Sequence, residues 1–136
     1  MSQENVEVMR RVFESLNARS AETMEQLVTP DAEWRPVLTA GGDLERRVYR
    51  GSAGIVQYWT DLDELFEGTE IQVEEVEPIG PDHVLFGGRV IARGRRSGVP
   101  LDERIWALCE LRDRKFFRGT AYRSRADALE AVGLRE

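Results

Sequence analysis

The feature that most constrains the fold is a change of hydrophobic period near Thr69. From there to Tyr122 apolar and polar residues alternate, which is the pattern of half-buried β-strands. The alternating runs are IQVEEVEPI, VLFGGRVIAR, VPLDERIWALCEL and KFFRGTAY, and the turns between them are Pro81-Asp82, GRRSG and RDR. Successive strands joined by tight turns predict an antiparallel meander.

Before Thr69 the period is mainly helical. Apolar residues recur at i, i+3, i+7 and i+10 in a first helix that we expect to run to about Arg19, namely Val6, Met9, Phe13 and Leu16. We expect Ser20 to cap a second helix, which Pro30 then stops. The apolar face of this helix is Met24, Leu27 and Val28.

A first strand is predicted from Ala32 to Val37, followed by a flexible turn at 39–43, TAGGD. A third helix is predicted with Ser52 as its cap and Gly68 as its end. Its buried face would consist of Ile55, Trp59, Leu62 and Phe66.

A short last helix is expected to begin at Ser124, with Asp127 as capping partner, and to end at Gly133. Leu129 and Val132 would face inward. Helices gathered on one face of a curved antiparallel sheet give an α+β fold. The 136 residues suffice for a single domain, 1–136.

Composition excludes several classes of function. A net charge of −6 argues against a nucleic-acid partner, because phosphate binding needs clustered cations. Cys109 is the only cysteine, which excludes an intrachain disulfide and a cysteine-based metal site. The charged N-terminus does not resemble a secretory signal, and no apolar run of ~18 residues occurs. We therefore expect a cytoplasmic protein without a membrane partner.

The ordered set of segments resembles a known superfamily. These segments are VEVMRRVFESLNAR, LVTPDAEWRP, YRGSAGIVQYW, GRRSG and YRSRADALEAVGL. Together they are similar to the nuclear transport factor 2-like superfamily, within it to the SnoaL-like polyketide cyclase group. The resemblance implies a cone, in which a curved sheet wraps three helices around an apolar pocket. It also implies a homodimer formed through the outer face of the sheet.

The superfamily contains enzymes and non-enzymes, so each site position needs its own test. Alignment with ketosteroid isomerases places Val12, Arg35 and Ala107 where that chemistry needs a Tyr and two Asp residues. Val and Ala cannot titrate, and Arg stays protonated, so this chain is not such an isomerase. SnoaL-type cyclases use an acid or base on a late strand. The corresponding residues here include none, since they are Ile105, Ala107, Cys109 and Leu111.

Glu33 and Arg35 lie two apart on the first strand and are the candidate catalytic pair. Arg35 would bind an anionic group, and Glu33 would act as base if burial raised its pKa. The alternative is an ion pair at the rim of the pocket. An enzyme of this kind would perform cofactor-independent isomerisation, cyclisation or hydrolysis. The other hypotheses are ligand binding without catalysis and a dimerisation module.

The candidate ligand-binding residues are mainly aromatic: Phe13, Trp59, Phe66 and Phe86, with Cys109 as an apolar neighbour. They are expected to bind a small, largely apolar organic molecule, although aromatics at this spacing also form ordinary core. Small residues on interior strands favour a real cavity, and these are Gly87, Gly88, Ala107, Gly119 and Ala121. His83 is the only histidine and lies in a turn, so we expect no metal site and no cofactor.

The opposite sheet face is the predicted dimer surface. Its apolar residues are Ile91, Trp106, Leu108 and Tyr122, and its charged residues are Arg89, Arg104, Glu110 and Arg118. An apolar patch fringed by charge is typical of a homodimer interface.

Overall fold

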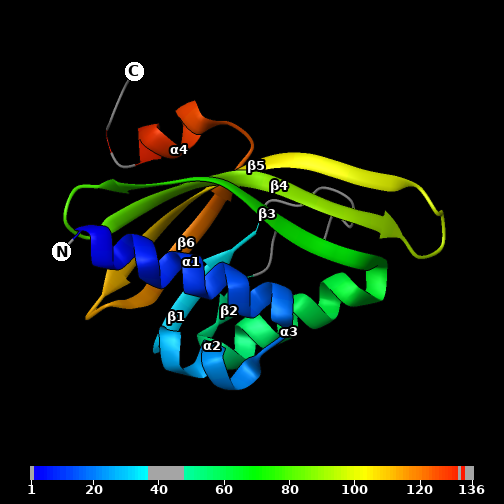
Figure 1. Cartoon of the computed structure of the whole chain (residues 1–136), viewed down its shortest axis with the longest axis horizontal. Helices are drawn as coiled ribbons and strands as arrows, with labels where there is room; N and C mark the ends of the chain where they lie inside the picture. The colour runs from blue at the N-terminus through cyan, green and yellow to red at the C-terminus, as the bar shows by residue number, and fades with distance from the viewer. Residues whose placement is uncertain (1, 37–47, 132, 134–136) are drawn as a thin grey trace.

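A computed structural model describes residues 2–36, 48–131 and 133 of the chain (Figure 1). Its helices are α1 (Ser2–Ala18), α2 (Ala21–Leu27), α3 (Gly51–Leu65) and α4 (Arg125–Ala131). Its strands are β1 (Val28–Arg35), β2 (Tyr49–Arg50), β3 (Phe66–Ile79), β4 (His83–Gly94), β5 (Pro100–Arg112) and β6 (Lys115–Tyr122). The predicted turn at 39–43 lies outside the described residues, as do Val37 and Val132.

The strands form one curved sheet in the order β2-β1-β6-β5-β4-β3. The meander from β3 to β6 is antiparallel throughout, which confirms the prediction from the period-two pattern. β1 pairs with β6 in the parallel direction and places the N-terminal half of the chain beside its C-terminal strand. The fold is therefore the predicted cone-shaped α+β architecture.

The helical hairpin forms as its sequence predicts. Val6, Met9, Phe13 and Leu16 of α1 are all buried. The backbone reverses at Arg19, whose φ is 56°. Ser20 then caps α2 through its hydroxyl, which accepts a hydrogen bond from the amide of Thr23 at 3.3 Å.

β1 begins earlier than predicted. It follows α2 directly at Val28 and ends at Arg35, so Pro30 lies inside the strand and does not mark the end of a helix. Pro30 is exposed, and the register between β1 and β6 shifts between Val28 and Glu33. Because proline has no N–H to donate to a ladder, an irregular stretch of strand tolerates it.

α3 differs from its prediction at both ends. Its N-cap is Arg50, without a side-chain capping bond, so the expected cap at Ser52 was wrong. The chain enters the helix through Gly51, whose φ of 68° favours glycine. The helix ends at Leu65, because Phe66 already belongs to β3. Gly68 has the expected positive φ of 66°, but it lies where the β3 register with β4 shifts.

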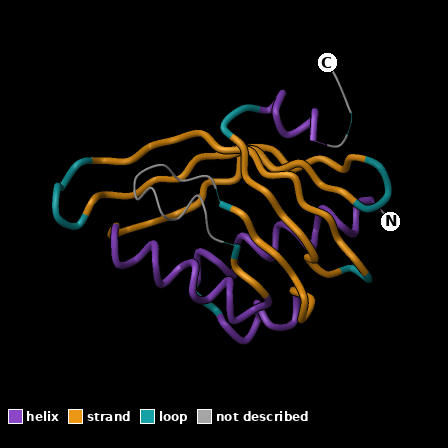
Figure 2. The backbone as a smooth tube through the Cα atoms, turned by 180° about the vertical axis from the view of Figure 1, so that it is seen from behind, coloured by secondary structure: helices purple, strands orange, loops and turns teal. Residues whose placement is uncertain are grey.

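α4 forms with the predicted cap, in which the amide of Asp127 donates to the hydroxyl of Ser124 at 3.1 Å. Its position corrects the expectation that all helices share one face. α1, α2 and α3 cover the concave face, whereas α4 lies on the other side of the sheet (Figures 1 and 2). There Ala128 and Leu129 bury Leu85 of β4 in a second small core.

Asn17 of α1 fastens the helix to the edge of the sheet. Its Nδ2 donates to the carbonyl of Ile71, and its Oδ1 accepts from the amide of Ile71, both at 2.9 Å. Ile71 lies on β3, the outermost strand on that side. The side-chain amide thus satisfies both backbone groups that a further strand would otherwise bind.

We predict that Asn17→Ala lowers the free energy of unfolding by about 1–3 kcal/mol, because the amide and carbonyl of Ile71 both lose their partner. Urea denaturation followed by circular dichroism measures this change. Gln72→Ala is the control, because the exposed Gln72 side chain binds, among the described residues, only the Glu70 side chain. Equal stability of the two variants would show that water replaces Asn17 without loss.

Candidate functional site

A small cavity lies between the concave face of the sheet and the helices, with a volume of about 40 Å³. Every described element except β2 and α4 contributes to its wall. The lining residues are Met9, Val12, Phe13, Leu16, Met24, Val28, Trp34, Ile55, Tyr58, Ile71, Phe86, Ile105, Ala107, Cys109 and Phe116. The cavity is thus a gap in the main hydrophobic core and not a separate surface depression.

Two stacked rings form part of the cavity wall. The centroids of Phe13 on α1 and Phe86 on β4 are 4.1 Å apart, with 25° between the ring planes. Phe86 is fully buried and Phe13 is 7% exposed. Because both side chains line the cavity, their rotamers set how much of the cone is open.

The structure brings together only some of the predicted lining residues. Phe13, Phe86 and Cys109 line the cavity, whereas Trp59 and Phe66 do not. α3 presents Ile55 and Tyr58 to it, while Trp59 is buried elsewhere in the core. Phe66 is the first residue of β3 and lies at a separate groove beside the turn between β4 and β5.

The small strand residues leave less space than expected, because neighbouring rings fill the gaps. A Cβ added at Gly119 would approach Phe116 at 2.7 Å and Trp34 at 3.1 Å. A Cβ added at Gly88 would lie 2.7 Å from the Phe86 ring. Of the small residues singled out in the sequence, Ala107 alone lines the cavity.

Polar groups on the cavity wall are few. Burial raises the pKa of the Cys109 thiol to about 12 and raises that of the Tyr58 phenol far above its ordinary range. Both groups therefore keep their protons at neutral pH. The third polar group is the indole of Trp34, whose buried Nε1 atom lies against the Tyr58 hydroxyl and partly offsets the rise in the pKa of that phenol.

Tyr58 and Trp34 were not among the site residues predicted from the sequence, although their spacing along α3 and β1 could have indicated them. Alternation along β1 places Trp34 on the face opposite Glu33 and Arg35. Tyr58 lies three residues after Ile55 on α3 and shares its face. The Tyr58 ring packs edge-on against both Trp34 and Tyr49, with centroid distances of 5.8 and 5.3 Å.

Glu33 and Arg35 share a strand face, but neither lines the cavity. Glu33 pairs with Arg35 at 3.0 Å and with Arg50 of β2 at 2.6 Å. The hydrogen bond from Arg50, assisted by Arg35, holds the pKa of Glu33 below its ordinary value. A carboxylate stabilised in this way is a weak base, so the geometry favours the ion-pair alternative over the catalytic one.

A family comparison matches residues 9–119 to the model of the SnoaL-like domain. The chain belongs to the SnoaL-like domain family. No curated protein matches the chain.

Solved structures with the same fold align with nearly the whole length of this SnoaL-like chain. Bal32a, from a soil-derived mobile gene cassette, is 17% identical with a TM-score of 0.79, covering 96% of each chain. TerC, co-crystallized with polyporic acid, is 20% identical with a TM-score of 0.76, covering 96% of this chain and 99% of its own. An NTF2-like protein from Burkholderia xenovorans LB400 is 19% identical with a TM-score of 0.71, covering 88% of each.

Two of the positions aligned with isomerase catalytic residues do face the cavity of this SnoaL-like domain. Val12 and Ala107 both line it, without a hydrogen-bonding side chain, whereas Arg35 lies outside the lining. Over the described ranges, no three His, Cys, Asp or Glu side chains are grouped to hold a metal ion. The described part of the chain also has no helix long and apolar enough to cross a membrane.

We predict that Glu33→Gln destabilises the SnoaL-like domain at neutral pH and not in acid. Because the folded-state pKa of Glu33 is lowered, its carboxylate stabilises the fold above the ordinary pKa of 4.5. That contribution is lost as pH falls through the lower folded-state value. Urea denaturation across this range should show the two proteins converging in acid.

The control is Glu25→Gln, because Glu25 is exposed on α2 and forms no ion pair with a described residue. If the free energies of unfolding of wild type and Glu33→Gln differ by the same amount at every pH, the result would contradict the ion-pair role.

Proposed function

We propose that this SnoaL-like domain binds a small, largely apolar organic molecule in its central cavity without acid-base catalysis. The observation that carries the proposal is the lining, which consists of apolar side chains and the neutral groups Tyr58, Cys109 and Trp34. Apolar walls with few polar groups are typical of small-molecule sites. The similar fold of TerC, co-crystallized with polyporic acid, supports the same reading.

The cavity must widen to hold such a molecule. Its 40 Å³ would hold about three water molecules, whereas a benzene site needs about 150 Å³. The adaptable part of the wall is the Phe13–Phe86 stack together with Met9 and Met24, since methionine side chains repack at low cost. We therefore propose that ligand binding displaces one of the stacked rings.

Catalysis is the less favoured alternative because the cavity lacks a base. Isomerisation and cyclisation require a group that accepts a proton. Tyr58 and Cys109 can donate protons, but their raised pKa values leave them protonated and unable to accept one. No carboxylate or imidazole is among the described lining residues. The third alternative, a dimerisation module with a filled interior, is disfavoured by the open space.

We predict that Ala107→Leu abolishes ligand binding, because the larger side chain enters the cavity from β5. Untargeted mass spectrometry of protein purified from its own host would detect bound molecules. The wild type should carry a small organic molecule, which the variant should lack. Such overpacking costs about 1–3 kcal/mol of stability, which leaves a folded protein.

Ala92→Leu is the matched control, because Ala92 is buried in β4 but does not line the cavity. Retention of the same molecule by both variants would place the binding site outside the cavity. A wild-type protein that carries no molecule and binds none from a library of small organic molecules would contradict the proposal.

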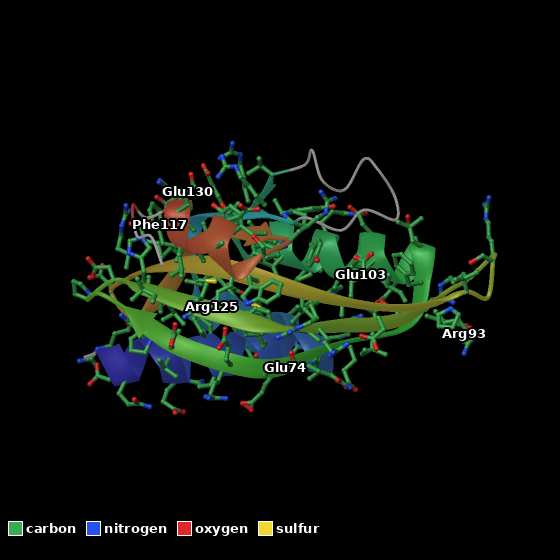
Figure 3. All side chains as sticks on the ribbon, turned by 90° about the horizontal axis from the view of Figure 1, so that it is seen from above. Glu74, Arg93, Glu103, Phe117, Arg125 and Glu130 are labelled. Carbon is green, nitrogen blue, oxygen red and sulfur yellow. The ribbon has the colours of Figure 1, made fainter. Side chains whose placement is uncertain are left out.

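We also propose that the domain forms a homodimer through the outer sheet face. Ile91, Trp106 and Leu108 are partly exposed on that face. Salt bridges from Arg89 to Glu74 at 3.2 Å and to Asp102 at 2.8 Å flank them. α4 covers Leu85 and packs against Trp106 and Tyr122. Because α4 lies over part of the sheet (Figure 3), the proposed interface is confined to the sheet beside it.

We predict that Leu108→Glu converts a dimer into a monomer, because a charge placed in an apolar interface loses its hydration. Analytical ultracentrifugation measures the change. Leu65→Glu is the control, since Leu65 is an exposed leucine at the end of α3 on the helical side. A wild-type monomer, or equal dissociation of both variants, would contradict this interface.

A further inference from the structure

The hydroxyl of Tyr58 brings a hydrogen-bond donor to the wall of the central cavity. Tyr58 lines the cavity from α3 and is only 4% exposed. A phenol oxygen accepts hydrogen bonds and also carries one proton of its own. The indole N–H of Trp34 lies against this oxygen and donates to it, and Trp34 is its only hydrogen-bond partner among the described residues. The proton of Tyr58 is therefore left without an acceptor in that part of the chain.

The indole N–H also sets the direction of the Tyr58 proton. Because two hydrogen atoms cannot point at each other, a hydroxyl that accepts a hydrogen bond on one side turns its proton to another side. The Trp34 ring takes one side of Tyr58, at a centroid distance of 5.8 Å, and the Tyr49 ring takes a second side at 5.3 Å. The cavity is the open space that Tyr58 lines, and the proton can turn into it.

The same two rings hold the phenol in place. Both pack edge-on, with 70° between the planes of Trp34 and Tyr58 and 61° between those of Tyr49 and Tyr58. Tyr49 is itself anchored, because its hydroxyl donates to the Asp61 carboxylate at 2.6 Å. A donor whose position is fixed before a ligand arrives loses little entropy when the ligand binds.

The other polar groups on the described part of the wall compete poorly for this proton. An indole nitrogen can only donate, and the Cys109 thiol is a weak acceptor. A buried water molecule is typically held by about three hydrogen bonds, and a loosely held one is easily displaced by a ligand oxygen. Burial raises the pKa of Tyr58 far above its ordinary range, so the phenol keeps its proton at neutral pH.

The charge of the wall favours a neutral acceptor over an anionic one. None of the described lining residues is Arg, Lys or His. A carboxylate that entered the cavity would lose its hydration without gaining a cation. A carbonyl oxygen loses much less, and it recovers a hydrogen bond from the phenol.

We propose that Tyr58 determines ligand specificity by donating its phenol proton to a neutral carbonyl oxygen, such as that of a ketone, on an otherwise apolar ligand. This inference rests on the proposed binding function and adds the chemical class of the ligand. A hydrocarbon of the same shape would leave the proton of Tyr58 without an acceptor.

The test compares three small probes. Cyclopentanone and methylenecyclopentane have nearly equal shapes and differ in C=O against C=CH₂, whereas cyclopentanecarboxylate carries a charge. Isothermal titration calorimetry measures their affinities for the wild type and for Phe86→Leu, in which a smaller side chain replaces one of the stacked rings. We expect the two neutral probes to bind and the carboxylate not to bind measurably.

Tyr58→Phe removes the donor and keeps the ring. It should weaken cyclopentanone binding about 3- to 10-fold, the range of a net hydrogen bond, and leave methylenecyclopentane binding unchanged. Tyr49→Phe is the matched control, because it removes the neighbouring phenol hydroxyl from a residue that does not line the cavity. Infrared difference spectra provide a second readout. The carbonyl stretch of bound cyclopentanone should lie at a lower frequency in the wild type and in Tyr49→Phe than in Tyr58→Phe.

The outcomes separate this inference from the binding function itself. If the neutral probes bind and Tyr58→Phe weakens neither, if Tyr49→Phe causes an equal loss, or if the carboxylate binds as tightly as the ketone, the inference fails while the binding function stands. If no probe binds the wild type or Phe86→Leu, the inference also fails, and mass spectrometry of the wild type and Ala107→Leu decides the binding function separately. A selective loss in Tyr58→Phe, together with the shifted carbonyl stretch, supports both.

Discussion

The stack of Phe13 on Phe86 is the contact on which the rest of the cone depends. It joins α1 to the first half of β4, at a centroid distance of 4.1 Å. A curved sheet can bury its concave face only if a helix approaches that closely. Both rings also line the cavity, so one contact both holds the two layers together and limits the volume left for a ligand.

Local chemistry made much of the fold predictable. The period-two runs gave the meander, and hydroxyls at Ser20 and Ser124 gave two helix starts, because each signal acts within a few residues. The start of α3 was missed because it depends on a positive φ at Gly51, beside the Pro30 carbonyl of a distant segment. The side of the sheet that α4 covers was missed for a similar reason, since Leu85 offers an apolar partner on the outer face.

The site was less predictable than the fold because it depends on which face of each element turns inward. Periodicity groups Glu33 with Arg35 and separates both from Trp34, but it does not say which group is inside. Tertiary packing decides this, since the bulky indole fills the space above Gly119 while the charged pair meets Arg50. On α3, Tyr58 and not Trp59 reaches the cavity, although the two are adjacent in sequence.

The two hydrogen bonds between Asn17 and Ile71 affect how copies of this protein can associate. β3 is long and lies at the border of the sheet, and such strands are templates for fibril growth when their peptide groups are free. The amide of Asn17 occupies the peptide groups of Ile71 in the middle of that border. These two hydrogen bonds therefore block continuous extension of the sheet from one molecule to the next at Ile71.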